Sequence, residues 1–355
     1  MSSREVRKPG KQGTWYLGDA NRLSDQLEGF LGDVPNQIDG SDVPIPRARV
    51  IMAPSVPTCQ VPLERLSYVP LHRVLTRGMG YRHAGYSYSG PTAAWAYKSL
   101  DLSQAKRVFL LGPSHTFYLR GCALTSFKKY GTPWGNLEVD QEITEKLRRD
   151  HDIPDIPSSN DNREHSLEMH LPFLWVSLLN AFGSPDKFPT LVPILVGDND
   201  KAGEREAGSW LLPYLREPSN AFIVSSDFCH WGDHFSYRPY SPEAKADSTL
   251  RQLSHRSVPS GKPIHETIKV LDDLAIEAIK SGKYEQFYDN LAATKNTVCG
   301  RHPIGVTMAA LEALAAERGA GEDECRFKFI RYDRSNLVEE PDDFSVSYVS
   351  AYAVV

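Results

Sequence analysis

The sequence predicts an α/β domain in which helices flank a largely parallel central sheet. Short apolar runs have the length of buried strands, at residues 49–53, 107–112, 190–197, 221–226, 325–332 and 344–354. Segments of helical periodicity alternate with them, at residues 21–31, 92–100, 142–149, 166–179, 264–279 and 304–316. Strands buried on both faces and separated by helices are typical of a parallel sheet covered on each side.

Local signals support several of these elements in chain order. Asp140 stands where the N-cap of the helix 142–149 is expected, because a short carboxylate side chain accepts the free N–H groups of a first turn. Ser241 is a second N-cap candidate, and Pro242 after it suits a first helical turn. The last two strands, 325–332 and 344–354, are close in sequence and are expected to be adjacent and antiparallel.

Length and composition suggest one large domain over residues 1–355. The net charge is −5 and the Lys and Arg residues are scattered, so charge gives no argument for nucleic acid or an anionic membrane as a partner. No apolar run has the length needed for membrane insertion, and residues 1–12 look like a disordered tail without a secretory signal. Five dispersed cysteines without a CxxC pair indicate reduced thiols, hence the cytoplasm, with the nucleus as a second compartment.

Residues 55–82 do not fit this pattern. The segment lies between the strand 49–53 and His83, and Pro57, Pro62 and Pro70 break its regularity. A connection of this length without secondary structure is uncommon inside a compact domain, so we interpret it as an atypical insertion.

Four segments present a histidine or a cysteine beside a strand end or a helix start: His83, His115, His230 and Cys299. Parallel sheets bind ligands beyond the carboxyl ends of their strands, and His115 and His230 follow two such ends. Imidazole and thiolate are both metal ligands. These segments therefore predict a mononuclear metal site at one edge of the sheet. Each residue alone has a structural alternative: a loop or turn histidine for His83 and His115, and a buried small side chain for Cys299.

The polar cluster after the strand 221–226 favours a role in this site, because so many polar groups are costly to bury without partners. His230 would be a general acid-base or substrate-binding group, and Asp227 an orienting residue or an extra ligand. Glu164 and His165 fit a charged helix start, with the pocket wall as the alternative. Other pocket candidates are Tyr86, Trp231 and His302.

Eight segments, in order along nearly the whole chain, resemble the Memo family, which is named for receptor-kinase-driven cell motility. They include HAGYSYSG (83–90), LGPSH (111–115), EHSLEMHLP (164–172), SSDFCHWG (225–232) and CGRHPIG (299–305). The family is similar in fold to the LigB-type class III extradiol dioxygenases, which hold non-haem iron through two histidines and a carboxylate. The resemblance therefore implies a LigB-like fold and places the metal ligands on His83, His115 and Cys299, with His230 as the acid-base residue beside Asp227.

Cysteine in place of the dioxygenase carboxylate softens the ligand set, which favours copper or an electronically altered iron. Family members are linked to iron and copper, to redox chemistry and to phosphorylated peptides in signalling. The same comparison joins residue 54 directly to His83, so we hypothesise that residues 55–82 are an in-frame retained intron, with a lineage-specific loop as the alternative.

Three functions follow from these patterns. The first is a non-haem iron or copper oxidoreductase, or a metal-handling protein, that acts on a small molecule or dioxygen and serves signalling and cell motility. The second is a non-catalytic scaffold whose pocket binds phosphopeptides or partner proteins. The third is a thiol enzyme with Cys299 as nucleophile and His302 or His230 as its base.

Overall fold

The computed structural model describes residues 4–55, 85–321 and 323–355. Its central sheet has the strand order β11-β15-β4-β10-β5-β9-β6, with β14 beside β15. Four neighbouring strands are parallel: β4 (Val50–Ala53), β10 (Asn220–Ser225), β5 (Arg107–Pro113) and β9 (Thr190–Val196). The antiparallel strands lie outside them: β6 (Cys122–Leu124), β11 (His230–Trp231), β14 (Lys328–Arg334) and β15 (Ser345–Ala353). The predicted fold class is confirmed, as is the antiparallel pairing of the last two predicted strands.

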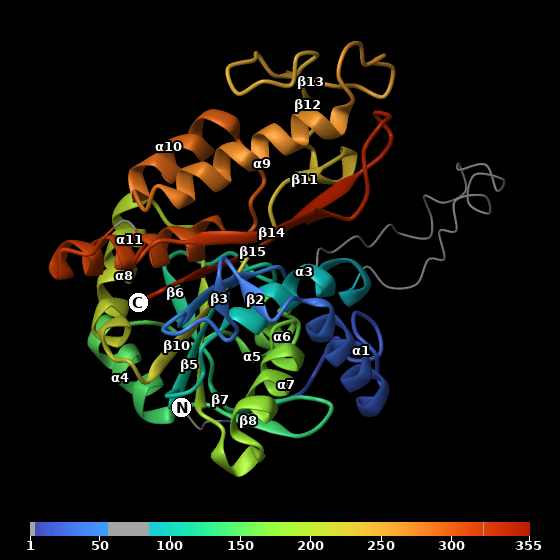
Figure 1. Cartoon of the computed structure of the whole chain (residues 1–355). Helices are drawn as coiled ribbons and strands as arrows, with labels where there is room; N and C mark the ends of the chain where they lie inside the picture. The colour runs from blue at the N-terminus through green and yellow to red at the C-terminus, as the bar shows by residue number, and fades with distance from the viewer. Residues whose placement is uncertain (1–3, 56–84, 322) are drawn as a thin grey trace.

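Helices cover both faces of the sheet because successive strand residues point to opposite sides. In β4, Ile51 packs into one core, and Val50 and Met52 into the other. The first core is closed by α1 (Ala20–Asp33), α3 (Tyr86–Ser99) and α7 (Leu171–Phe182). The second core is closed by α4 (Gln141–His151), α8 (Lys201–Arg216), α9 (Ile264–Lys280), α10 (Tyr284–Thr294) and α11 (Arg301–Arg318). Figure 1 shows these two groups of helices on either side of the sheet.

A third, smaller core lies around the N-terminal half of α9. Trp231 of β11 and Tyr240 of β12 (Pro239–Tyr240) pack there against Ile264 and Ile268. Two short elements complete this part of the chain, the 3-10 helix η3 (Asp233–Phe235) and β13 (Arg251–Gln252).

The N-terminus differs from the expected disordered tail over residues 1–12. Its described part forms β1 (Arg4–Arg7), which pairs in parallel with β7 (Phe127–Gly131), and β7 in turn pairs with β8 (Asn136–Glu138). The side chain of Arg7 is fully buried between two carboxylates. The correction has a physical reason: ionic partners that lie far along the chain hold this polar segment in place.

Local helix signals have mixed outcomes. Asp140 is confirmed as an N-cap, since its carboxylate accepts the backbone N–H of Ile143 at 3.0 Å. Ser241 begins no helix; its N–H and C=O instead bond the hydroxyl of Thr267 on α9. The helix predicted at 166–179 divides into α6 (His165–Glu168) and α7, and Pro172 in the first turn of α7 explains the break.

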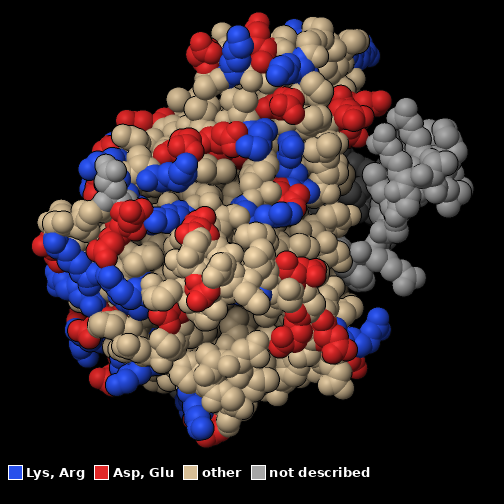
Figure 2. Space-filling model, viewed as in Figure 1, with Lys and Arg blue, Asp and Glu red and all other residues tan. Residues whose placement is uncertain are grey.

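The remaining short elements are β2 (Gln37–Ile38), β3 (Ser41–Asp42), α5 (Ser158–Asp161) and the 3-10 helix η2 (Pro185–Lys187). The predicted insertion at 55–82 lies outside the described residues except for Ser55, and so does His83. Among the described residues, no helix combines the length and apolar character that crossing a bilayer requires. On the face shown in Figure 2, basic and acidic side chains are interspersed.

Candidate metal centre

The candidate site lies where β10 and β5 end and α11 begins. Asp227 and His230 follow β10, His115 follows β5, and Cys299 lies two residues before the first residue of α11. The Cys299 turn is tied to the β10 end, because the backbone N–H of Cys299 donates to the Asp227 carbonyl at 3.2 Å. Gly300 permits this approach, since a Cβ there would lie 2.4 Å from the Ser225 carbonyl oxygen.

Asp227, His230 and Cys299 form a compact group of ligand atoms. One such atom from each lies within 4.8 Å of the other two. Asp227 is only 1% exposed, and its Oδ1 has no hydrogen-bond partner among the described residues. Its Oδ2 accepts a 3.4 Å bond from the hydroxyl of Ser55. A buried carboxylate oxygen without a partner is costly and needs a proton, a water or a cation.

The Cys299 thiol favours its ionised form. Burial alone would raise its pKa, but contact with the His115 ring lowers it, and the net shift is below the ordinary thiol value. The backbone N–H of Asp227 also donates to Sγ at 3.1 Å. Burial, followed by the negative charge of Cys299, raises the pKa of Asp227 well above its usual range. The two shifts are opposite in direction, so the surroundings favour a negative charge on Cys299 over one on Asp227.

His230 has a fixed tautomer. Its Nδ1 lies 2.8 Å from the Phe228 carbonyl oxygen and 3.0 Å from the Thr297 carbonyl oxygen, which are both acceptors, so Nδ1 carries the hydrogen. Burial lowers the pKa of His230 to about 4 and outweighs the two carbonyls, which raise it. The ring is therefore neutral at pH 7, and its Nε2 has a free lone pair for a proton or a metal.

His115 lies between Cys299 and Glu164. Glu164 Oε2 accepts the backbone N–H of His115 at 2.8 Å, and Oε1 lies 3.0 Å from its Nδ1. Burial would lower the pKa of His115, but its hydrogen bonds to Cys299 and Glu164 raise it to about 10. Its side chain is 29% exposed, so it presents a positive charge at the mouth of the site when no metal is bound.

His165 stacks on His115, with ring centroids 4.2 Å apart, and packs against Trp15. Burial, followed by the charge of His115, lowers the pKa of His165 to about 3. One possible ligand atom from each of His115, Glu164 and His165 also lies within 4.8 Å of the other two. The Glu164 carboxylate, however, already accepts the N–H groups of His165 and Ser166 in addition to the two His115 bonds. Of the two groups, the one that contains Cys299 is therefore the better candidate for a metal site.

Three predicted pocket residues do not join this group. Trp231 is fully buried in the third core, and its indole N–H donates to the Pro239 carbonyl at 2.9 Å. The Tyr86 hydroxyl donates to the Met169 carbonyl at 2.6 Å.

His302 pairs through Nδ1 with Glu204 at 2.6 Å and through Nε2 with Asp198 at 3.3 Å. It therefore links α11 to α8 instead of facing Cys299. His83 lies outside the described residues, so its role as a ligand stays a prediction.

The structure adds residues that the sequence patterns did not identify. The Thr297 hydroxyl accepts the His230 N–H at 2.8 Å and donates to the His230 carbonyl at 2.9 Å. The buried carboxylate of Asp272 accepts the Cys229 N–H at 3.0 Å and the Asn296 amide at 3.2 Å, which ties together the two loops that carry His230 and Cys299. Thr297 could have been found from the sequence because it lies two residues before Cys299. Asp272 lies in the middle of α9, and no sequence pattern connects it with the site.

These residues fit a thiophilic transition metal. The Cys299 sulfur, the neutral His230 imidazole and an Asp227 oxygen that has no hydrogen-bond partner among the described residues supply a mixed sulfur, nitrogen and oxygen donor set. Cys299 and His115 also lie in contact, as expected if both bind the same ion.

Comparison with known proteins gives consistent matches. Residues 67–352 match the family described as Memo-like protein. The Caenorhabditis elegans protein memo-1 homolog is 35% identical over 99% of this chain and 83% of its own length. Protein MEMO1 of Homo sapiens is 34% identical over the full length of both chains. A MEMO1 family protein of Schizosaccharomyces pombe is 33% identical over 99% of this chain and 100% of its own length.

Among solved structures, an uncharacterized protein of Escherichia coli K12 aligns with 73% of this chain and 89% of its own, at 13% identity and a TM-score of 0.38. A likeness at that level carries no argument about fold or function, so the LigB-like character of the fold stays a prediction.

Proposed function

Since this chain belongs to the Memo family, we propose that it binds one iron or copper ion at Cys299 and serves in metal-dependent redox chemistry or metal handling linked to signalling and cell motility. One observation carries the proposal. The Asp227, His230 and Cys299 ligand atoms converge within 4.8 Å, and Asp227 Oδ1 is buried with no hydrogen-bond partner in the part of the chain that the structure describes. This arrangement is unfavourable in the absence of a further cation or proton and is suited to a metal.

Two ligand sets share Cys299. The family resemblance favours His83, His115 and Cys299, with His230 and Asp227 free to act on a bound molecule. The geometry of the described residues offers Asp227, His230 and Cys299 as the other set. We propose the first set, because the family resemblance implies it and because His115 and Cys299 each shift the pKa of the other. Asp227 and His230, which converge on Cys299, would then lie beside the bound ion.

The chain's own residues then have distinct roles. An iron or copper ion would supply one-electron redox chemistry. His230 holds its Nδ1 hydrogen on two carbonyl oxygens and presents Nε2, which accepts a hydrogen bond or a proton from a hydroxyl group of the bound molecule. Burial and the negative charge of Cys299 raise the pKa of Asp227 well above its usual range, which favours the protonated form of this side chain.

Metal analysis of variants tests the proposal. We expect protein purified anaerobically, without chelator or affinity metal, to contain near-stoichiometric iron or copper. Cys299→Ala and His115→Ala should lose the metal, and His230→Ala should retain it. Cys122→Ala, which removes a buried thiol elsewhere in the sheet, is the matched control and should also retain it. Metal that persists in Cys299→Ala would contradict the proposal, and loss in His230→Ala but not in His115→Ala would select the second ligand set.

A second candidate is a scaffold that binds the anionic group of a phosphopeptide without turnover. The partly exposed His115 ring, whose pKa is raised to about 10, favours it because the ring is positively charged at pH 7. A parent protein without metal that binds a phosphopeptide, and a His115→Ala variant that does not, would support this function over the first.

A further inference from the structure

Glu164 makes two contacts with one residue of the site. Its Oε2 accepts the backbone N–H of His115 at 2.8 Å, and its Oε1 lies 3.0 Å from the ring Nδ1 of the same residue. An ionised carboxylate only accepts hydrogen bonds, so Nδ1 carries a hydrogen. The other ring nitrogen, Nε2, is then the atom left to face Cys299.

Glu164 is already engaged by several N–H groups of its own surroundings. Oε1 also accepts the backbone N–H groups of His165 at 2.9 Å and Ser166 at 3.0 Å, and the residue is fully buried. The carboxylate thus accepts four N–H groups, three at Oε1 and one at Oε2, and two of the four belong to His115. Its contribution to the site is made through His115.

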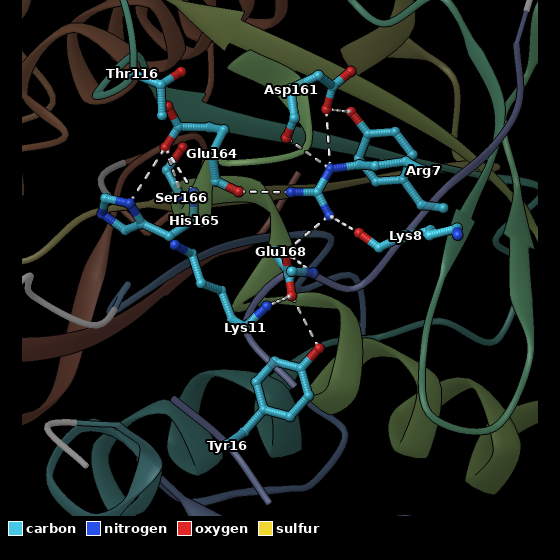
Figure 3. Close-up of polar contacts among 12 residues, drawn as sticks. Arg7, Lys8, Lys11, Tyr16, Thr116, Asp161, Glu164, His165, Ser166 and Glu168 are labelled. Carbon is cyan, nitrogen blue, oxygen red and sulfur yellow. Dashed lines mark hydrogen bonds and ion pairs between the residues drawn. The ribbon is translucent and has the colours of Figure 1, made fainter. Parts of the chain in front are cut away.

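The backbone of Glu164 is bound by Arg7, the last residue of strand β1. Arg7 Nη2 donates to the Glu164 carbonyl at 2.7 Å, while the rest of its guanidinium binds Asp161 at 3.0 Å and Glu168 at 2.9 Å. Glu168 is fixed further by the hydroxyl of Tyr16 at 3.0 Å. Figure 3 shows Arg7 between Asp161, Glu164 and Glu168, so the turn is anchored at three points along its length.

We propose that Glu164 is a positioning residue, which Arg7 holds in place and which orients His115 so that Nε2 points to Cys299 and to the metal. This inference rests on the proposed metal centre. A metal-binding histidine commonly donates its second ring N–H to a carboxylate, which fixes the tautomer and the ring orientation. The pair Glu164–His115 has this arrangement, and the additional bond to the His115 backbone fixes the base of the same side chain.

The variant Glu164→Gln tests the role. It keeps the size of the side chain but cannot accept N–H groups on both of its terminal atoms. Metal-free protein would be titrated with Co²⁺, and binding followed by the thiolate-to-cobalt charge-transfer absorption. We expect the affinity for Co²⁺ to be about 10–100-fold weaker than in the parent, the usual cost of removing such a partner.

Ser166→Ala is the matched control. It removes a buried 2.8 Å bond from the Ser166 hydroxyl to the Pro113 carbonyl in the same turn and leaves both Glu164–His115 contacts intact. We expect parent-like Co²⁺ affinity. An equal loss in both variants would show that the turn matters only through packing, and parent-like affinity in Glu164→Gln would also overturn the proposal.

A second readout does not depend on metal. In protein labelled with ¹⁵N-histidine, the Nδ1–H of His115 should be protected from exchange in the parent and in Ser166→Ala, and unprotected in Glu164→Gln. Should Glu164→Gln fail to fold, Glu164→Asp, which shortens the side chain by one methylene, should show the same loss. If the parent binds no Co²⁺, the metal centre fails while this signal still decides the role of Glu164. A protected Nδ1–H of His115 in the Glu164 variants would refute that role.

Discussion

Replacing Arg7 by alanine should be among the most damaging single changes in the N-terminal part of the chain. Its guanidinium is fully buried and donates to the Asp161 carboxylate at 3.0 Å, the Glu168 carboxylate at 2.9 Å and the Glu164 carbonyl at 2.7 Å. Alanine would leave two carboxylates buried without their cation. Removing one partner of a buried ion pair typically costs about 3–5 kcal/mol of unfolding free energy, so we expect a loss in this range.

Arg47→Ala provides the comparison. Arg47 pairs with Glu324 at 2.9 Å, a distance close to those of Arg7, but the two side chains are 56% and 35% exposed. Exposed pairs contribute about 0–1 kcal/mol because water and salt screen them. Urea unfolding of the parent and both variants, with linear extrapolation to water, gives the two losses. If Arg7→Ala costs no more than Arg47→Ala, the assigned role of the N-terminal strand is wrong.

Three further predictions concern the loops and the pH response. Gly300→Ala should lower stability by about 1–3 kcal/mol, because the new Cβ would lie 2.4 Å from the Ser225 carbonyl oxygen; an unchanged melting temperature would contradict this. Burial lowers the pKa of His170 to about 3, whereas an unfolded histidine titrates near pH ~6.5, so the unfolded state binds more protons in between and stability should fall as the pH drops through this window. His170→Gln should flatten that dependence by up to about 1.4 kcal/mol per pH unit in urea unfolding at pH 4 to 7, and an unchanged slope would refute the assignment. Thr297→Val removes the hydroxyl that bonds both the N–H and the C=O of His230, so unfolding free energy should drop by about 1–3 kcal/mol, while a parent-like value would show that the loop is held by other contacts.

The sequence predicted the central sheet well because its strands carry their own signal. The runs that became β4, β5, β9 and β10 are short, apolar and buried on both faces, so composition and length alone identify them. Helix α8 was not predicted, since Gly203, Gly208 and Pro213 lower its apparent helix propensity. In the structure Gly208 lies against α11, and a Cβ at this position would come within 2.9 Å of the Ala309 Cβ. The glycine that weakens the sequence signal for α8 therefore also allows α8 and α11 to pack closely.

The sequence predicted only those site residues that are marked by their position next to a strand or a helix. His115, His230 and Cys299 follow strand ends or precede a helix, and that position is visible in the sequence. The contacts of Arg7 with Asp161 and Glu168 join residues more than 150 positions apart, and no local pattern in a polar N-terminus reveals them. The tautomer of His230 depends likewise on a carbonyl supplied by Thr297.

The place of β4 in the sheet has a consequence for how the protein is synthesised. Residues of this early strand pair on one side with β10 and on the other with β15, so that Val50 lies opposite Phe222 and Ala353. During translation, β4 therefore emerges long before either neighbour: one backbone edge waits for β10, which ends at Ser225, and the other waits for β15 near the end of the chain. Topologies dominated by such distant pairings fold slowly, and exposed strand edges are prone to intermolecular association. We expect the nascent chain to depend on chaperones until β15 is released. The proposed metal centre, which needs both β10 and the Cys299 turn, should be among the last parts to form.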